Sequence, residues 1–463
     1  MRYVSTRGQA PVLPFEETLL AGLARDGGLY VPDALPVLSR TELNELSGAS
    51  FETVAARVLA PFVEGCIDDD AFEDMIRRAY AGFGHKLRCP LVQIGPNDWV
   101  LELHHGPTLA FKDVAMQLIG QLFAHVLGRR DERVTIIGAT SGDTGSAAIE
   151  AFRGNPVADV FILYPHGRVS EVQRRQMTTP TEPNVHALAV EGTFDDCQAL
   201  VKAMFNDFSF RDDVSLGAVN SINWARVMAQ TVYYVTAALA LGAPGRPVSF
   251  SVPTGNFGDI YAGHVAREMG LPIERLIIAT NENDILHRAF ESGHYVKDKV
   301  VPTNSPSMDI QVSSNFERAL FEAYDRDGLS VRGLMEDLKG GAFEIAEEPL
   351  AHLRNRFASA RVSQAEVAET IRRIHGETGQ LLDPHSAIGV HAAGQRRGDH
   401  ATPMISLACA HAAKFPDAVE AASGIRPALP ARMADLYERD ERVTVVANDL
   451  AEIQNLIRER RSR

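Results

Sequence analysis

The sequence contains little cysteine and no pair of cysteines spaced for a zinc site. Four cysteines occur in 463 residues, far from one another, at Cys66, Cys89, Cys197 and Cys409. A disulfide framework needs many cysteines in a short chain, and a zinc site commonly uses Cys-x-x-Cys pairs. The spacing argues against both and is typical of a reducing compartment. We therefore expect no metal site and a cytoplasmic protein.

Long hydrophobic runs and basic clusters are also scarce. The longest apolar run, residues 232–241, is too short to span a bilayer, and no apolar segment follows the early arginines. The formal net charge is −14, and arginines are dense only at residues 458–463. Such an acidic chain is not attracted to nucleic acid or to anionic membranes. We expect a small-molecule partner, neither nucleic acid nor a membrane, and a monomer or a homodimer.

The sequence does contain a repeated pattern of strand, glycine-rich loop and helix. Residues 133–137 are typical of a buried strand, and a loop at 138–145 and a helix from 146 follow. The same order recurs as a strand at 248–252, a loop at 253–259 and a helix at 260–269. Alternation of this kind predicts an α/β fold, with two parallel sheets covered by helices.

The chain is long enough for two or three domains. Residues 1–95 are mainly helical by their apolar spacing, after an opening loop, and predict a cap or an oligomer contact. We expect one α/β domain at 96–240 and a second at 241–463. The second would include a peripheral insertion at about 285–375, where much of the charge lies.

One lysine lies among small and apolar neighbours just after a Gly-Pro pair. This is Lys112, in His-Gly-Pro-Thr-Leu-Ala-Phe-Lys-Asp at residues 105–113. Burial disfavours a charged amine and can make it a nucleophile and a proton carrier, as in Schiff-base enzymes. The alternative is an ordinary solvated lysine in the first turn of a helix.

Both glycine-rich loops are candidate anion sites. A loop between a strand and a helix exposes backbone N–H groups at the positive end of the helix dipole. Neither loop continues into Gly-Lys-Ser/Thr or Gly-x-Gly-x-x-Gly, so the anion is not expected to be ATP or a dinucleotide. The alternative is a tight turn that uses glycine only for its positive φ. Two such loops together with Lys112 favour a small anionic cofactor and an anionic substrate.

These motifs resemble the threonine synthase family, specifically its longer bacterial and fungal branch. The resemblance rests on their order and spacing across most of the chain. Its motifs are Gly-Leu-Tyr-Val-Pro at 28–32, Gly-Pro-Thr-Leu-Ala-Phe-Lys-Asp at 106–113, Ala-Thr-Ser-Gly-Asp-Thr-Gly at 139–145, Asn-Ser-Ile-Asn at 220–223 with Arg226, Thr-Gly-Asn-Phe-Gly-Asp at 254–259 and Ala-Thr-Asn at 279–281. The family has the tryptophan synthase β-like fold of type II pyridoxal 5′-phosphate enzymes, in which two α/β domains hold the cofactor between them.

The resemblance implies roles for the loop residues. Lys112 matches the lysine that forms the Schiff base with the cofactor and later moves protons. The loop that holds the cofactor phosphate matches Gly255, Asn256, Phe257 and Gly258. The loop that receives the substrate carboxylate, near the ring oxygen of the cofactor, matches Ser141, Gly142, Asp143 and Thr144.

Further matches concern the substrate phosphate and the pyridine nitrogen. The group proposed to bind the substrate phosphate matches Asn220, Ser221, Asn223 and Arg226. Asn223 and Ser221 could instead cap the next helix, and Arg226 could be a surface arginine. Cys409 stands where the family typically has a threonine that faces the pyridine nitrogen. A thiol is a weak neutral donor that could replace it, and a simple buried hydrophobic role is the alternative.

The resemblance implies the conversion of O-phospho-L-homoserine and water into L-threonine and phosphate. A related lyase or dehydratase acting on a hydroxy- or phospho-amino acid is the alternative of the same fold. Two alternatives belong to other classes, a catalytically silent homologue that binds the cofactor or a partner protein, and a nucleotide-binding regulatory module. The missing nucleotide motifs argue against the last of these.

Overall fold

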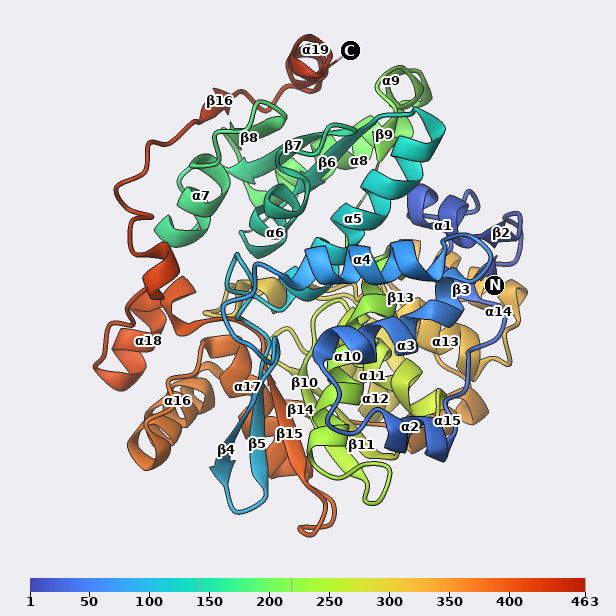
Figure 1. The fold of residues 1–463 in the computed structure, drawn as a ribbon, viewed down its shortest axis with the longest axis vertical. Coiled ribbons are helices and arrows are strands. Elements are labelled where there is room, and N and C mark those ends of the chain that lie inside the picture. The colour runs from blue at the N-terminus through green and yellow to red at the C-terminus, as the bar shows by residue number, and fades with distance from the viewer. Residues whose placement is uncertain (141, 218, 463) are drawn as a thin grey trace.

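The computed structural model describes residues 1–140, 142–217 and 219–462. The larger of two main sheets has six strands within these ranges, and its neighbours are parallel except for the edge strand β4. From one edge to the other its order is β14 (Phe357–Arg361), β11 (Ile273–Thr280), β10 (Val248–Pro253), β15 (Met404–Ala408), β5 (Asp98–Glu102) and β4 (Leu91–Gly95). Figure 1 shows this sheet in the lower half of the molecule.

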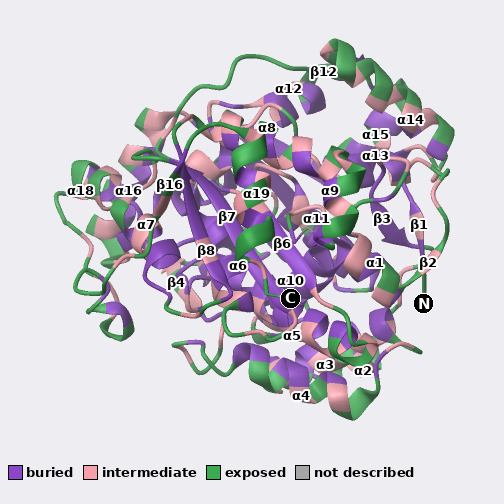
Figure 2. Ribbon diagram, turned by 90° about the horizontal axis from the view of Figure 1, so that it is seen from above, coloured by how far each residue is buried: buried purple, intermediate pink, exposed green. Residues whose placement is uncertain are grey.

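The second main sheet lies above the first in Figure 1 and is parallel throughout its described strands. Its order is β16 (Thr444–Val446), β8 (Val185–Val190), β7 (Ala158–Pro165), β6 (Val134–Ala139) and β9 (Leu216–Gly217). Every residue of β7 is buried, as a strand needs to be when helices cover both faces of its sheet. Figure 2 shows β6, β7 and β8 as mostly buried and the nearby helices α9 and α19 as partly exposed.

Helices surround the second sheet and connect it to the first. Those near the second sheet are α6 (Asp143–Phe152), α7 (Glu171–Thr178), α8 (Phe194–Asn206), α9 (Phe208–Asp213) and α19 (Leu450–Arg460). Long buried helices occupy the middle of the molecule, where α10 packs against α5 and α11. Their bounds are α5 (Lys112–Arg130), α10 (Trp224–Ala240) and α11 (Gly258–Glu268).

The N-terminal part is mainly helical, as predicted, but it also contains a small antiparallel sheet. Its helices are α1 (Phe15–Ala21), α2 (Arg40–Glu45), α3 (Phe51–Val63) and α4 (Asp69–Tyr80). The sheet joins β2 (Leu13–Pro14), β1 (Arg2–Ser5) and β3 (Tyr30–Pro32). Strands this short carry too little alternation to be recognised in the opening loop. The apolar face of α3 packs on α10, so this part is continuous with the main core.

The region at 285–375 combines surface helices with a strand of the first sheet. Its elements before β14 are α12 (Ile285–Ser292), β12 (His294–Val296), η1 (Pro306–Met308), α13 (Phe316–Ala323), α14 (Gly328–Asp337), η2 (Leu338–Gly340), β13 (Ala342–Glu344) and α15 (Glu347–Arg356). Because β14 pairs with β11, the region is not wholly peripheral. After β14 follow α16 (Gln364–Thr378), α17 (Pro384–Arg396), η3 (Ala412–Lys414), α18 (Pro416–Ser423) and η4 (Ala431–Met433).

The α/β class with two parallel sheets is the predicted one, but the sheets do not follow the order of the chain. The first sheet takes β4 and β5 from the early part and β10, β11, β14 and β15 from the later part. The second sheet takes its edge strand β16 from the C-terminal region. The boundary expected at 240/241 therefore does not separate the sheets, because strand pairing depends on contacts that are distant in sequence.

Among the residues that the structure describes, no helix is long and apolar enough to cross a membrane. Neither do three or more histidine, cysteine or acidic side chains gather there as a metal site would require. The four cysteines are free.

Candidate active site

Lys112 is the first residue of α5. The loop that precedes it is hydrogen-bonded to the segment after β15. The Phe111 N–H donates to the carbonyl of Cys409 (2.8 Å), and Ala110 forms an isolated bridge with Ala410. Leu109 has a φ of 64°, which turns the loop toward the helix. Lys112 is only 7% exposed, so it is not a solvated surface lysine. Burial lowers the pKa of its amine, as Lys414 and Arg226 also do, whereas Asp143 opposes them.

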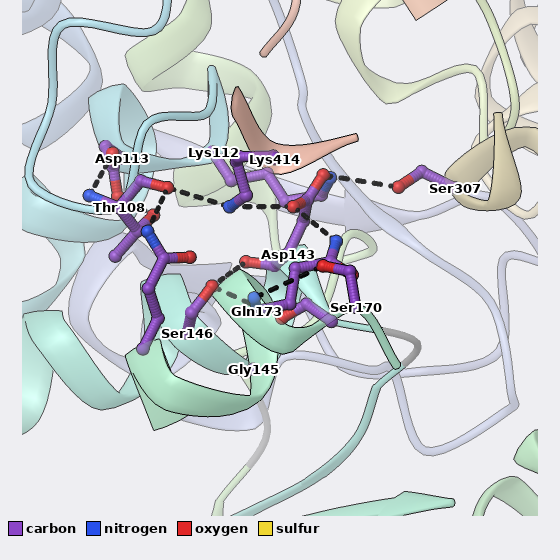
Figure 3. A network of polar contacts seen from close by, with 12 residues as sticks. Thr108, Lys112, Asp113, Asp143, Gly145, Ser146, Ser170, Gln173, Ser307 and Lys414 are labelled. Atoms are coloured by element: carbon purple, nitrogen blue, oxygen red, sulfur yellow. Dashed lines mark hydrogen bonds and ion pairs between the residues drawn. The ribbon is translucent and has the colours of Figure 1, made fainter. Parts of the chain in front are cut away.

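Asp143 is the centre of the polar network around Lys112, as Figure 3 shows. It begins α6, so it approaches from the second sheet while Lys112 approaches from the first. One carboxylate oxygen, Oδ2, accepts from the Lys112 amine (3.3 Å) and from the hydroxyl of Ser307 (3.4 Å). The other, Oδ1, accepts from the side-chain amide of Gln173 (2.9 Å) and lies 2.8 Å from the Lys414 amine. The site is therefore built between the two sheets.

The loop around Asp143 is held by hydrogen bonds between its own residues. The hydroxyl of Thr140 accepts from the backbone N–H of Gly142 (3.0 Å) and of Gly145 (2.9 Å). Gly142 has a φ of 140°, and a Cβ there would lie 2.3 Å from the side chain of Gln173. Only glycine fits this position, so the turn depends on the glycine at residue 142. Of the predicted carboxylate loop, Gly142, Asp143 and Thr144 are placed here, whereas Ser141 lies outside the described residues.

The loop between β10 and α11 differs in that its backbone N–H groups lack such acceptors among the described residues. Phe257 has a φ of 64° and precedes the helix, and its ring is buried. Among the described residues, none accepts a hydrogen bond from the backbone N–H groups of residues 255–258. A Cβ at Gly255 would lie 2.9 Å from the Ser307 carbonyl oxygen. Free N–H groups at the start of an 11-residue helix form a cradle suited to a phosphate. The four predicted positions, Gly255, Asn256, Phe257 and Gly258, form this cradle.

Arg226 is buried on α10, which excludes the surface-arginine alternative. It is 4% exposed, and its Nε and Nη1 atoms have no hydrogen-bond partner among the described residues. Burial lowers its pKa to about 10, against the opposing effects of Tyr233 and Asp259. A buried guanidinium without a partner is costly, and an anion with several oxygens would satisfy it. This observation fits the predicted binding of a phosphate.

The other residues of this group are arranged differently. Asn223 caps α10, because its side chain accepts from the Ala225 N–H (3.1 Å) and donates to the Leu19 carbonyl (2.8 Å). Ser221 accepts a bond from the Asn315 side chain at its carbonyl (3.1 Å), and Asn220 is exposed. The capping alternative therefore holds for Asn223. Contact of these three residues with a substrate stays a prediction.

Cys409 follows β15 in a buried position. Its N–H donates to the hydroxyl of Ser386 (2.9 Å), and its thiol lies 3.8 Å from the Leu407 carbonyl oxygen. Burial raises the pKa of the thiol well above its ordinary value. The group is therefore a neutral thiol, as a partner for a pyridine nitrogen would need to be. Its facing of that nitrogen stays a prediction.

The sequence alone assigned no role to three residues of the Asp143 network. Lys414 follows a buried strand in an apolar segment, which is the same signal that drew attention to Lys112. Gln173 lies on α7, where its neighbours give no such signal, and Ser307 lies in η1 within a loop. Their part in the site depends on tertiary contacts with α6.

Comparisons with known proteins support the class that this arrangement indicates. A family model described as pyridoxal-phosphate dependent enzyme matches residues 88–405. A solved structure of a PLP-bound threonine synthase from Brucella melitensis has a TM-score of 0.97 and 58% identity, and covers 99% of both chains. A buried lysine and an open N–H cradle are what such a cofactor requires. The chain is therefore a pyridoxal-phosphate dependent enzyme of fold type II.

Two further family models and several relatives narrow this class. The models, threonine synthase N terminus and threonine synthase, C-terminal, match residues 2–80 and 386–457. A threonine synthase from Pseudomonas aeruginosa is 55% identical over 459 residues, which are 99% of this chain and 98% of the relative. The solved yeast threonine synthase has a TM-score of 0.94 at 41% identity, covering 99% of this chain and 98% of that one. The chain belongs to the threonine synthase family.

Proposed function

We propose that the chain converts O-phospho-L-homoserine and water into L-threonine and phosphate with pyridoxal 5′-phosphate as cofactor. Family membership over the full length supports the proposal. The observation that carries it is the buried guanidinium of Arg226, whose Nε and Nη1 have no hydrogen-bond partner among the described residues and which is close enough to Lys112 to affect its pKa. A phosphate on the substrate would satisfy this cation. A substrate with a plain hydroxyl group would leave it unpaired.

Three parts of the site would bind the cofactor. Lys112 would attach the cofactor, and the N–H groups of residues 255–258 would hold its phosphate. The neutral thiol of Cys409 would face its pyridine nitrogen. When bound, the cofactor supplies an electron sink for negative charge at the substrate carbons.

Proton transfer would be the task of the freed Lys112 amine. It would remove the proton at Cα, pass that proton to the phosphate group of the substrate, and then remove one at Cβ, after which the protonated phosphate leaves from Cγ. Water would then add at Cβ, and protons would return to Cα and Cγ. A single positioned base with a lowered pKa can serve these carbons in turn. Arg226 would hold the phosphate, Gly142 and Thr144, with Ser141, would receive the substrate carboxylate, and Asp143 would lie near the ring oxygen of the cofactor.

The setting of this reaction belongs to the same proposal. We place the enzyme in the cytoplasm, acting on a small molecule without nucleic acid or membrane, as a monomer or a homodimer. The net charge of −14 and the scarcity of cysteine support this setting.

Product analysis tests the proposal directly. The purified protein, incubated with O-phospho-L-homoserine, is expected to release threonine and phosphate in equal amounts. Release of 2-oxobutanoate without threonine would favour the related lyase or dehydratase instead. Borohydride reduction followed by peptide mapping is expected to find the cofactor on Lys112, and Lys112→Ala is expected to lose turnover by about 10²-fold or more.

The phosphate assignment has its own test in Arg226→Met. Its kcat/KM for O-phospho-L-homoserine is expected to fall by about 10²-fold or more, because a desolvated charge partner of the substrate is lost. The substrate-free protein should keep its melting temperature, since the removed group has no partner for Nε or Nη1 among the described residues. Arg25→Met, which removes an exposed arginine, is the matched control. Unchanged kcat/KM in Arg226→Met would remove Arg226 from the phosphate site.

A further inference from the structure

A second lysine is buried beside Lys112. Lys414 lies at the end of η3, and its side chain is 0% exposed. Its amine donates to the Thr108 carbonyl oxygen (2.7 Å) and lies 2.8 Å from Asp143 Oδ1. Figure 3 shows both contacts. The proposed function gives this residue no task.

The charges in this cluster are not balanced if both lysines are protonated. Asp143 is a single carboxylate shared by Lys112, at 3.3 Å, and Lys414, at 2.8 Å. Buried charges are stable only when they are paired and hydrogen-bonded. Lys414 has the shorter ion pair and also a backbone carbonyl acceptor. Lys112 has the longer contact and, apart from it, the ring of Phe111 at 4.7 Å. Lys414 is therefore the better-held cation.

Other charged groups around Lys112 do not restore the balance. Arg226 on α10 adds a third positive charge, and Asp259 on α11 and the Cys409 thiol also interact electrostatically with Lys112. Asp113, beside Lys112 on α5, is buried and accepts from the N–H (2.8 Å) and the hydroxyl (2.6 Å) of Thr108. Burial raises the pKa of Asp113, which reduces its value as a counter-ion.

Asp143 itself is firmly ionised. Burial alone would raise its pKa, but Lys414, then Lys112 and His385, hold that pKa well below the usual range. Gln173 and Ser307 add neutral hydrogen bonds from α7 and η1. A carboxylate that keeps its charge can be neutralised by one lysine only. The second lysine then gains little from carrying a proton.

We propose that Lys414 is a positioning residue that acts through Asp143: it is the permanent counter-ion of this carboxylate and leaves the Lys112 amine free to act as a base. When the amine takes a proton from a substrate carbon, the ammonium that forms lies next to Asp143 Oδ2 until that proton is passed on. The inference rests on the proposed function only for the identity of that carbon acid, because the charge relation exists without substrate.

The direct test is the pH at which Lys112 reacts with an amine-labelling reagent, followed by peptide mapping of the full chain after removal of the cofactor. In the native sequence, Lys112 is expected to react with a midpoint below that of the exposed Lys86 and Lys202. In Lys414→Met, Asp143 is left to Lys112 alone, so the midpoint is expected to rise by about one pH unit or more. Lys414→Arg should restore it, and Lys202→Met should leave it unchanged.

The holoenzyme gives a second readout. The acidic limb of the pH profile of kcat/KM, and the pH titration of the bound cofactor's absorption, are both expected to move upward in Lys414→Met. Circular dichroism and the melting temperature establish that the variant is folded. A folded Lys414→Met with an unmoved labelling midpoint would overturn the inference. So would a native protein in which Lys112 titrates together with Lys86 and Lys202, a result that needs no variant to fold.

The two proposals fail in distinguishable ways. If the protein makes no threonine but Lys112 shows the lowered midpoint and its dependence on Lys414, the charge relation stands and the reaction was wrongly assigned. If threonine is made and the labelling midpoint of Lys112 is the same in Lys414→Met as in the native sequence, the reaction stands and Lys414 is structural only.

Discussion

The two glycine-rich loops use the same local sequence in opposite environments. Each is followed by a Gly-Asp pair at the start of a helix, Gly142-Asp143 at α6 and Gly258-Asp259 at α11. Asp143 lies between two lysine amines, which hold its pKa well below the usual range against the effect of burial. Asp259 has no lysine that close. It accepts from the hydroxyls of Tyr233 and Tyr234, and burial raises its pKa to about 6.

The backbone N–H groups of the loops differ in the same way. In the first loop, Thr140 satisfies those of Gly142 and Gly145, which fixes the position of Asp143. In the second loop, the groups of residues 255–258 have no acceptor among the described residues. The first loop therefore presents a carboxylate, and the second presents donors. The comparison teaches that the donors a glycine-rich loop offers to an anion depend on which of its N–H groups the protein itself has already bound.

The largest effect is expected when the hydroxyl of Thr140, which binds two N–H groups of the first loop, is removed. Thr140→Val leaves two N–H groups without an acceptor, next to a buried side chain. The free energy of unfolding is expected to fall by about 2 to 6 kcal/mol, at about 1 to 3 kcal/mol for each unsatisfied group. Urea denaturation measures it, and Thr140→Ser, which keeps the hydroxyl, is the control. Equal stability of the valine and serine variants would show that the hydroxyl does not close the loop.

The next effect compares the two carboxylates by pH. The folded-state pKa of Asp259 is about 6, above its ordinary 3.8. Ionisation of this residue therefore lowers the free energy of unfolding as pH rises through that range. Asp259→Asn lacks this loss and should gain about 2 to 3 kcal/mol relative to the native protein between pH 4 and pH 7. Denaturation curves at both pH values measure the gain.

Asp143→Asn should show the opposite sign. The lowered pKa of Asp143 means that its stabilisation is present above the ordinary pKa and is lost only as pH falls through the folded-state value. Removing its charge is therefore expected to destabilise the protein at pH 7 relative to the native chain. If both variants respond to pH with the same sign, the contrast between the two environments is wrong.

The smallest expected effect concerns the second loop. Gly255→Ala would bring a Cβ to 2.9 Å from the Ser307 carbonyl oxygen and force the cradle to shift. Cofactor affinity is expected to fall by about tenfold, or about 1.4 kcal/mol. An absorption titration with pyridoxal 5′-phosphate measures it. Gly128→Ala on α5, where nothing lies within 4 Å of the added carbon, should bind as the native protein does. Equal affinities would place the cofactor phosphate elsewhere.

The sequence by itself determined the α/β class, the helical N-terminal part and the family. It also located Lys112 and the two loops, because strand, loop and helix patterns and a Gly-Pro break are local signals. The loops could be recognised as equivalent for the same reason. The sequence could not tell them apart, since both begin a helix after glycine.

Only the tertiary structure decided which chemistry each loop can perform. It brought Lys414 and Lys112 to opposite oxygens of Asp143, closed one loop with Thr140, and buried Arg226 with two nitrogen atoms unpaired among the described residues. It also distributed the strands between the sheets, where β16 joins β8 and β5 joins β15. These outcomes depend on burial and on contacts between distant segments, and charge and hydrogen-bonding partners are set by those contacts rather than by local sequence.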